Sequence, residues 1–337
     1  MPGTLWVIAE TGADGRLARI SAEVATLARG LGAAAGRDVA GVVVAPPGIA
    51  AGAAEELAAF LPPVVAVEAP AAATSPAGVV IATAVARMVS GDPSACLLVG
   101  ASADGRDIAG FLAAMLGAGV LTNAAAITWD GGPIVEKGVF GGRLVTTSEL
   151  AAGAGIVTVA LGSVTAEAAP AVGRVETVAL PDGAPSGTLA ADLPEAPPVT
   201  VLERVVEAAG AVQIEEAKII IAGGRGMGSA EGFRVADELA AELGGAVAAS
   251  RAAVDAGWIP YSRQVGQTGK VVKPEVYVAL GISGAVQHKV GMQGASTIVA
   301  INTDSDAPIA EFADMFVIGN LFEIVPALVA ELRARRT

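Results

Sequence analysis

A glycine-rich turn lies between an expected strand and an expected helix in the last third of the chain. It reads Ala222-Gly-Gly-Arg-Gly-Met-Gly-Ser229. Small residues in such a turn let backbone N–H groups approach a phosphate at the start of a helix. The dinucleotide fingerprint needs a third glycine where Ser229 stands, and an acidic residue after the next strand, where the chain has Ser250 and Arg251. The turn alone therefore fits a phosphate cradle and an ordinary strand-to-helix turn equally well.

Two arginines follow successive expected strands. Arg225 comes after the strand expected over 218–222, and Arg251 comes after the strand expected over 246–249. The carboxyl ends of parallel strands line the ligand crevice of an open α/β sheet, so we expect both arginines on one rim. Two guanidinium groups on one rim of an acidic protein favour a shared phosphate or electron-rich ring over two ordinary surface arginines.

Two later segments add further hydrogen-bonding groups. The loop 264–270 combines two glycines with amide, hydroxyl and ammonium groups, although a solvated turn would also tolerate them. Segment 278–288 continues from a strand through Ser283 and Gly284 into an expected helix start. His288 is the only histidine of the chain. With no second histidine or cysteine beside it, we expect no metal role for this residue.

Asparagines follow two more expected strands. Asn302 follows the strand expected over 297–301, and Asn320 follows the strand expected over 315–318. With the segments above, five strand ends offer polar groups on one side of the sheet. Polar turn residues scattered by chance would follow one or two strands rather than five. The pattern therefore predicts a large polar ligand such as a dinucleotide.

These residues must be positioned by alternating strands and helices. In the first half, strand patterns alternate with helix patterns, and the alternation restarts after residue 217. This pattern predicts an α/β fold of two domains, each a mostly parallel sheet flanked by helices, the C-terminal one doubly wound. The proline-rich composition of 181–200 blocks helices and central strands. We therefore expect an N-terminal domain over 1–180, a linker over 181–213 and a ligand-binding domain over 214–337.

The expected elements can be stated by range. We expect strands over 5–9, 39–45, 64–67, 96–100, 156–161, 218–222, 246–249, 276–280, 297–301 and 315–318, and helices over 16–31, 53–60, 108–116, 230–243 and 321–333.

Composition excludes several classes of function. The chain has 337 residues, of which 53% are hydrophobic and 4% aromatic, so its cores must be built from small aliphatic side chains. A net charge of −13 argues against general binding of nucleic acid or anionic membranes. The apolar stretches have strand length, so we expect no membrane insertion. Cys96 is the only cysteine, which excludes an intrachain disulfide. Without a visible leader sequence, we expect a cytoplasmic protein.

The C-terminal third resembles the alpha subunits of electron-transfer flavoproteins. The resemblance rests on the run SRAAVDAGWIPYSRQVGQTGKVVKPEVYVALGISGAVQHKVGM together with AGGRGMGS and AINTD, and covers nearly all of 218–328. In the first domain it rests on the α/β pattern and on GRDIAGFLAAMLGAGVLTNA.

The resemblance implies an FAD site and the residues that form it. One departure is the last element, usually Ala-Asp-Leu-Phe in the family, which here has Gly319 and Asn320 before Leu-Phe, so the carboxylate is lost. The implied FAD-binding residues are Arg225, Ser250, Arg251, Gln264, Val265, Gly266, Gln267, Thr268, Ser283, Gly284, Ala285, Val286, Gln287, His288, Asn302, Asn320 and Leu321.

The resemblance also implies a function and partners. It implies a one-electron carrier rather than an enzyme, with Arg251 over the flavin ring, Thr268 near N5 and His288 facing the O2 side. The carrier would accept electrons from flavin dehydrogenases, such as the acyl-CoA dehydrogenases of fatty acid beta-oxidation, and pass them to a membrane quinone oxidoreductase or another acceptor. It implies a heterodimer with a smaller beta subunit that commonly holds AMP, with the N-terminal domain making much of the contact.

Two other hypotheses fit parts of the sequence. An NADP-dependent oxidoreductase would use the glycine-rich turn and one arginine against a 2′-phosphate, but the chain shows no evident hydride-transfer residues. A non-redox nucleotide-binding regulatory subunit would use the same rim as a sensor. Neither hypothesis predicts a yellow protein with flavin absorbance.

Overall fold

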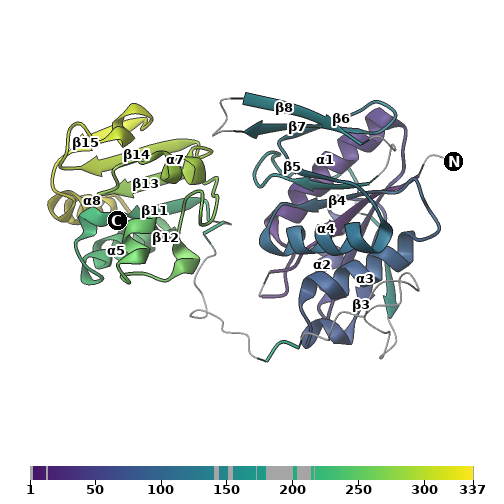
Figure 1. The fold of residues 1–337 in the computed structure, drawn as a ribbon. Coiled ribbons are helices and arrows are strands. Elements are labelled where there is room, and N and C mark those ends of the chain that lie inside the picture. The colour runs from purple at the N-terminus through teal and green to yellow at the C-terminus, as the bar shows by residue number, and fades with distance from the viewer. Residues whose placement is uncertain are drawn as a thin grey trace. The chain divides into compact units, whose positions relative to one another are not determined.

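The computed structural model describes residues 3–12, 14–139, 144–150, 155–171, 173–179, 200–202, 214–215 and 217–336. The chain divides into two compact units, Met1–Val206 and Glu207–Thr337, called unit 1 and unit 2 below. Each is an α/β layer structure in Figure 1. Of the predicted linker 181–213, all but 200–202 lies outside the described residues.

Unit 1 is built on a seven-stranded sheet whose described pairings are all parallel. Its order is β10-β3-β2-β1-β4-β9-β5. The central strands are almost fully buried on both faces, which explains their continuous runs of Val, Leu, Ile and Ala. The strands are β1 (Leu5–Ala9), β2 (Val39–Ala45), β3 (Val64–Glu68), β4 (Cys96–Gly100), β5 (Val120–Ala124), β9 (Ile156–Val159) and β10 (Val175–Ala179).

Four helices cover the two faces of this sheet. α1 (Arg19–Ala35) and α2 (Ala50–Ala58) pack on one face, and α3 (Ala77–Val89) and α4 (Ala103–Leu116) pack on the other. A short 3-10 turn, Pro70–Ala73, precedes α3. α1 and α4 each end at a glycine in the left-handed conformation, which allows a backbone hydrogen bond to close the last turn.

A small antiparallel sheet, which the sequence pattern did not indicate, joins this unit. It consists of β6 (Ala126–Trp129), β7 (Pro133–Val139) and β8 (Leu144–Glu149), in that order. It lies at the top of unit 1 in Figure 1. All six residues of β8 are exposed, including Leu144 at 57% and Val145 at 66%. β8 therefore lacks the buried face that makes a strand recognisable from sequence.

Unit 2 is a five-stranded parallel sheet of order β12-β11-β13-β14-β15. Helices α5, α6 and α8 pack on one face, and α7 packs on the other, so the unit is doubly wound as expected. The elements are β11 (Ile219–Gly223), α5 (Arg234–Leu243), β12 (Ala246–Ala249), α6 (Arg251–Asp255), β13 (Val276–Leu280), α7 (Val286–Met292), β14 (Thr297–Asn302), β15 (Met315–Ile318) and α8 (Leu321–Arg336), with 3-10 turns at Arg225–Met227, Glu231–Phe233, Tyr261–Arg263 and Pro308–Glu311.

Glu10 and Ser102 meet at the carboxyl edge of the unit 1 sheet, between β1 and β4, where the strand order reverses. Glu10 follows β1 and is 6% exposed. The Ser102 hydroxyl, at the N-cap of α4, donates to Glu10 Oε2 and accepts from the Gly105 N–H at 2.8 Å. Burial raises the pKa of Glu10 to about 7, although the Ser102 hydrogen bond opposes the shift.

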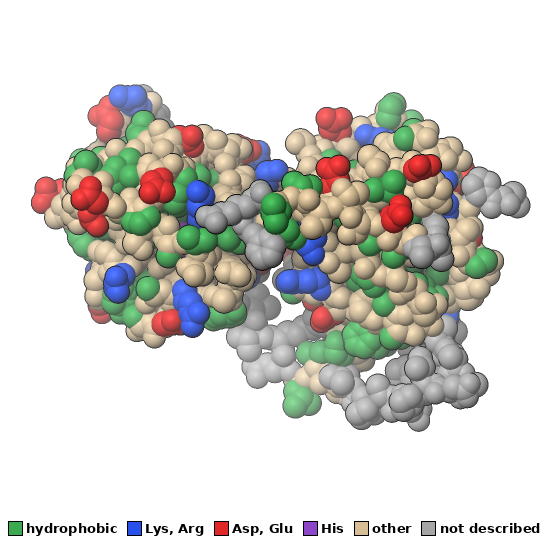
Figure 2. All heavy atoms as spheres, turned by 45° about the horizontal axis from the view of Figure 1, so that its top comes forward, with side chains coloured by type: hydrophobic (Ala, Val, Ile, Leu, Met, Phe, Trp, Pro, Cys, Tyr) green, Lys and Arg blue, Asp and Glu red, His purple; other side chains and the backbone are tan. Residues whose placement is uncertain are grey.

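The described surface shows no broad basic region on the face in view. Figure 2 shows acidic and basic side chains interspersed among polar and hydrophobic ones on each unit, in keeping with the net charge of −13. Among the described residues, no helix combines the length and apolar character needed to span a membrane.

Candidate functional site

A pocket of about 650 Å³ lies at the carboxyl edge of the unit 2 sheet. Its size falls within the usual range for small-molecule sites, roughly 300–1,000 Å³. It occupies the place where open α/β sheets bind ligands, because loops from β11, β12, β13 and β14 diverge there. Its lining is Arg225, Gly226, Ser250, Arg251, Ala252, Asp255, Val265, Gly266, Gln267, Thr268, Gly281, Ile282, Ser283, Ala285, Gln287, His288, Asn302, Asp304 and Ala307.

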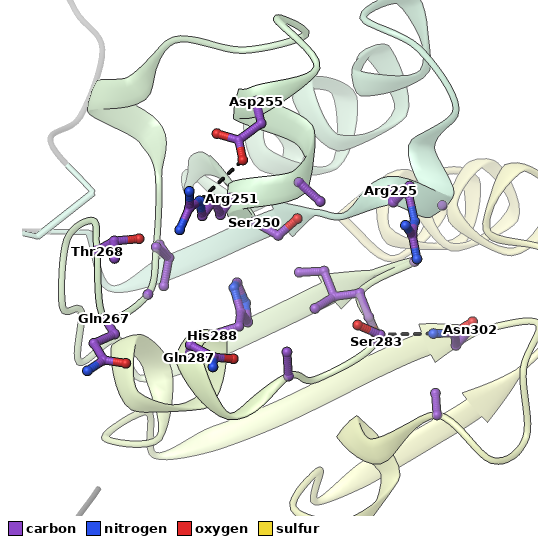
Figure 3. Close-up of a pocket in the computed structure, with 18 of the residues that line it drawn as sticks. Arg225, Ser250, Arg251, Asp255, Gln267, Thr268, Ser283, Gln287, His288 and Asn302 are labelled. Carbon is purple, nitrogen blue, oxygen red and sulfur yellow. Dashed lines mark hydrogen bonds and ion pairs between the residues drawn. The ribbon is translucent and has the colours of Figure 1, made fainter. Parts of the chain in front are cut away.

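The turn after β11 brings Arg225 to the pocket. Gly226 donates its N–H to the carbonyl of Gly281 at 3.0 Å, and a Cβ on Gly226 would lie 2.7 Å from the Gly281 Cα. The backbones that follow β11 and β13 are therefore in direct contact, which only glycine permits. The Arg225 side chain is exposed and lines the pocket wall (Figure 3).

The second arginine follows β12, the strand beside β11. Ser250 is the N-cap of α6, and Arg251 is its first residue. Arg251 Nε lies 3.2 Å from Asp255 Oδ2, and both side chains are more than half exposed. Figure 3 shows this pair on the α6 side of the pocket. An exposed pair one helical turn apart is weak, so Arg251 can exchange this partner for a bound anion at small cost.

The loop that follows α6 is held by a buried glutamine. Gln264 is 2% exposed, and its Nε2 donates to Thr268 Oγ1 at 3.1 Å. The Gln267 N–H donates to the carbonyl of Gln287 at 2.7 Å, which fixes the loop against the start of α7. Gly266 has φ 145°, and a Cβ there would lie 3.0 Å from the Gln287 oxygen. The loop thus presents Gln267 and Thr268 to the pocket from a fixed backbone.

The segment after β13 carries the buried histidine. His288 is 6% exposed, and its Nε2 lies 2.9 Å from the Tyr277 hydroxyl. Its Nδ1 is buried and makes no well-formed hydrogen bond among the described residues. Burial lowers the pKa of His288 to about 4, and the Val265 carbonyl opposes that shift. The ring is therefore neutral at physiological pH, and the cationic side chains in the pocket lining are Arg225 and Arg251.

Asn302, at the end of β14, completes the polar lining. Its Nδ2 donates to the Ile282 carbonyl at 3.1 Å, and its Oδ1 accepts from the Asp304 N–H at 3.1 Å. These bonds join the loops after β13 and β14. Asn302 lies on the same side of the view as Arg225 in Figure 3.

The residues present fit a large, polar, partly anionic ligand. Two guanidinium groups offer paired donors for phosphate, and hydroxyl and amide groups of Ser250, Gln267 and Thr268 offer neutral donors and acceptors. The glycine turns allow the backbone to pack closely at the pocket, and Nδ1 of His288 is a buried nitrogen without a described hydrogen-bond partner. Among the described residues, no three His, Cys, Asp or Glu side chains gather where they could hold a metal ion. The arrangement suits binding of a nucleotide-sized group.

Most of the site residues expected from the sequence line this pocket, and five lie outside its lining. Gln264 supports Thr268, as described. Gly284 forms a turn with φ 86°, where a Cβ would lie 2.4 Å from the Ile309 nitrogen. Val286 is 66% exposed, and Leu321, the first residue of α8, is buried in the core. Asn320 Oδ1 accepts from the Phe322 N–H at 3.0 Å, and Asn320 Nδ2 donates to Glu323, so its side chain serves the start of α8.

The sequence interpretation omitted several residues that the pocket contains. Gly226 and Gly281 belong to turns that immediately follow strands, which is the signal that could have identified them. Asp255 lies four residues after Arg251, so helical spacing could have placed it in the site. The omitted lining residues are Gly226, Ala252, Asp255, Gly281, Ile282, Asp304 and Ala307.

Two family models match the chain. Residues 213–293 match the electron transfer flavoprotein FAD-binding domain, and residues 5–183 match the electron transfer flavoprotein domain. The first match contains the loop 264–270 and the Tyr277–His288 contact, and the second spans most of unit 1.

Curated relatives match over almost the full length. The chain is 38% identical over 323 residues to electron transfer flavoprotein subunit alpha of Mycobacterium leprae (strain TN), covering 96% of each chain. It is 40% identical over 328 residues to the subunit of the same name from Mycobacterium tuberculosis (strain CDC 1551 / Oshkosh), again covering 96% of each. Similarity rises to 54% over 133 residues, 40% of each chain, with the Thermoanaerobacterium thermosaccharolyticum subunit alpha.

Proposed function

The chain belongs to the electron transfer flavoprotein family as an alpha subunit, and from this premise we propose that it is an electron carrier holding FAD in the unit 2 pocket. The observation that carries the proposal is the pocket itself. It lies at the carboxyl edge of a doubly wound sheet and combines two arginines with neutral donors and glycine turns. Much of its lining falls within the FAD-binding family match at 213–293.

The lining residues would divide the binding between them. Arg225 and Arg251 would bind anionic or electron-rich parts of the cofactor, while Ser250, Thr268 and Asn302 would hydrogen-bond its polar edges. Arg251 is the side chain we assign to the flavin ring, since its tie to Asp255 is weak enough to be replaced. His288 would contribute a neutral polar contact. When bound, FAD supplies the capacity to accept and release electrons, and the chain supplies position and electrostatics.

Membership as an alpha subunit implies a heterodimer with a beta subunit. We assign much of the contact to unit 1. The exposed strand β8 supports this assignment, because Leu144 and Val145 are apolar and more than half exposed on an edge strand of the antiparallel sheet. Edge strands of this kind are blunted or covered in stable proteins. The beta subunit, which we expect to hold AMP, is the covering partner we propose.

Electron donors and acceptors follow from the carrier role. We assign flavin dehydrogenases, acyl-CoA dehydrogenases among them, as donors, and a membrane quinone oxidoreductase or another acceptor as the recipient. The chain would act in the cytoplasm as a carrier rather than as an enzyme with its own substrate. The net charge of −13 supports docking to protein partners rather than to nucleic acid.

We divide the chain into an N-terminal domain over 1–180, a linker over 181–213 and an FAD-binding domain over 214–337. This division is supported by the family matches, one ending at 183 and the other beginning at 213. The separate hydrophobic cores of the two units support it as well.

The first test is the visible spectrum of the protein purified after co-expression with its beta subunit. We expect a yellow protein, and heating should release FAD that can be identified by chromatography. Stepwise anaerobic reduction should then show electrons entering one at a time. A colourless complex that also fails to take up added FAD would contradict the proposal.

A matched pair of arginine variants tests the pocket. Arg251→Ala should weaken FAD binding by about tenfold or more, because a hydrogen bond to a charged group contributes roughly 1.5–3 kcal/mol. Arg234→Ala is the control, because Arg234 is an exposed arginine of the same unit outside the pocket lining. Fluorescence titration of the apoprotein complex with FAD measures both. Equal affinities for the two variants would remove Arg251 from the site.

A further inference from the structure

The hydroxyl of Tyr277 is fully buried beneath the pocket floor. Tyr277 is 0% exposed within the core of unit 2, on β13. Within the described part of the chain, its hydroxyl has one hydrogen-bond partner, Nε2 of His288, at 2.9 Å. Tyr277 does not line the pocket, whereas His288 does. The described hydrogen bond that links the tyrosine to the pocket lining is therefore the one to the histidine.

The direction of this hydrogen bond follows from what each group can do. Burial raises the pKa of Tyr277 well above its ordinary value, so the phenol keeps its proton. A buried hydroxyl proton needs an acceptor, and Nε2 of His288 is the acceptor within reach. A neutral imidazole that accepts at Nε2 carries its own proton on Nδ1.

The opposite arrangement leaves more groups unsatisfied. If Nε2 carried the proton and donated to the phenol oxygen, the Tyr277 proton would be buried without an acceptor. Nδ1 would become a buried acceptor without a donor. The Val265 carbonyl, which also acts on the ring, makes no described hydrogen bond with Nδ1.

We propose that Tyr277 is a positioning residue that donates to Nε2 of His288 and thereby fixes its proton on Nδ1 as a neutral hydrogen-bond donor for the bound ligand. The proposal rests on the proposed function, since FAD is the ligand that would accept from this N–H. The buried, unpaired Nδ1 of a pocket-lining side chain is the group that would meet it. Figure 3 shows the His288 ring rising from α7 toward Ser250 and Arg251. Arg251 would thus supply a positive charge to the bound FAD, and His288 would supply an uncharged hydrogen-bond donor.

The chain allows an unusually clean test, because His288 is its only histidine. The full chain is produced with ¹⁵N-labelled histidine and no histidine tag, so one imidazole gives all the ring-nitrogen signals. A protonated ring nitrogen resonates far upfield of an unprotonated one. We expect one nitrogen of each kind, with Nδ1 protonated, and no change between pH 6 and pH 8. A proton on Nε2, or on both nitrogens, would overturn the proposal.

Two tyrosine variants show whether Tyr277 is responsible. In Tyr277→Phe, the two nitrogen signals should move toward each other as the tautomers mix. The chain has only two tyrosines, and the other, Tyr261, donates its hydroxyl to the Thr268 carbonyl. Tyr261→Phe is therefore the matched control and should leave the His288 signals in place. A folded Tyr277→Phe chain that keeps the wild-type tautomer would refute the assigned role.

A second measurement covers the case in which Tyr277→Phe does not fold. The Tyr261→Phe chain is produced with 3-fluorotyrosine, whose more acidic hydroxyl then occupies position 277 alone. A stronger donor should move the Nε2 signal upfield, and an unmoved Nε2 signal would contradict donation from Tyr277. FAD content is measured on the same variants co-expressed with the beta subunit, as in the spectral test above. Absence of FAD with the expected tautomer would defeat only the proposed function, and bound FAD with a different tautomer would defeat only this inference.

Discussion

The two units end their parallel sheets in opposite ways. In unit 1, Glu10 and Ser102 fill the carboxyl edge between β1 and β4, and Ser102 satisfies the start of α4. In unit 2, the loops at the same edge leave a pocket of about 650 Å³, and the Arg251 side chain finds only an exposed partner. The architecture is shared, so the side chains at the strand ends decide whether an edge is closed or binds a ligand.

The buried ionisable groups at the two edges sharpen this contrast. Burial shifts both toward the neutral form, raising the pKa of Glu10 to about 7 and lowering that of His288 to about 4. Glu10 Oε2 has an internal partner in Ser102, whereas its Oε1 is buried without a described hydrogen-bond partner. His288 keeps one nitrogen unpaired in a pocket wall. Ionisation of Glu10 should therefore change the stability of unit 1, whereas protonation of His288 should change ligand binding in unit 2.

The largest expected effect comes from a side chain that forces α7 away from the loop 264–270 at the pocket of unit 2. A Cβ on Gly291 of α7 would lie 2.3 Å from the Gly266 nitrogen and 2.5 Å from its Cα. Since both neighbours are backbone, Gly291→Ala should destabilise unit 2 by about 3 kcal/mol and abolish FAD binding. Gly294→Ala is the control, because its Cβ would meet only the flexible Lys273 side chain. Denaturant unfolding followed by Trp258 fluorescence, in a Trp6→Phe/Trp129→Phe background, reports on unit 2. Similar stabilities for both variants would show that this contact is relaxed in solution.

A comparable effect in unit 1 should depend on pH. Because its folded pKa is raised from 4.5 to about 7, Glu10 contributes stability that is fully present below pH 4.5 and is lost as pH rises past 7. Glu10→Gln should match wild type at pH 4.5 and be more stable by roughly 3 kcal/mol at pH 8. Unfolding followed by Trp6 and Trp129, in a Trp258→Phe background, measures the difference. A constant difference across this range would mean that Glu10 is not the group that titrates.

Removing the hydroxyl that closes the unit 1 edge should have a smaller effect. Ser102→Ala loses the cap of α4 and the donor to Glu10, so we expect a loss of about 1–2 kcal/mol. Ser102→Asn keeps a capping group and should recover part of the loss. The same fluorescence background measures both. An unchanged stability of Ser102→Ala would indicate that water satisfies this edge in place of the Ser102 hydroxyl.

The smallest effect is expected from the exposed pair of unit 2. Asp255→Asn removes the partner of Arg251 and should change stability by less than about 0.5 kcal/mol. The same change should strengthen FAD binding slightly, because the arginine is then free for the ligand. Thermal unfolding and FAD titration of the complex measure the two effects. A large loss of stability would show that Arg251 belongs to the fold more than to the site.

The sequence predicted the parallel framework well because its strands are buried on both faces. The strands over 5–9, 39–45 and 246–249 have the expected bounds, since short runs of Val, Ile and Ala between turns have few other interpretations. α3 was missed because Ala77–Val89 is rich in Ala and Val and largely buried, so its composition does not distinguish a buried helix from a buried strand. The sheet β6-β7-β8 was missed because β8 buries no face.

The candidate site was partly predictable for a related reason. Strand ends must meet at one edge of a parallel sheet, so Arg225, Arg251 and Asn302 could be grouped from topology alone. Whether a loop side chain faces the pocket or its own helix depends on local hydrogen bonds, which is why Asn320 was grouped with them although it caps α8. The Tyr277–His288 contact joins a strand interior to a helix, and the burial that keeps the ring neutral exists only in the packed unit.

The contact between Gly226 and Gly281 has a consequence for the entropy of binding. Two turns that would otherwise fluctuate separately are joined backbone to backbone by a hydrogen bond of 3.0 Å. A ligand that binds beside these turns finds this part of the rim already ordered, so little conformational entropy is lost there on association. Residence time should then depend mainly on the contacts formed with the bound group, and the apoprotein should keep the rim in the same shape as the loaded protein.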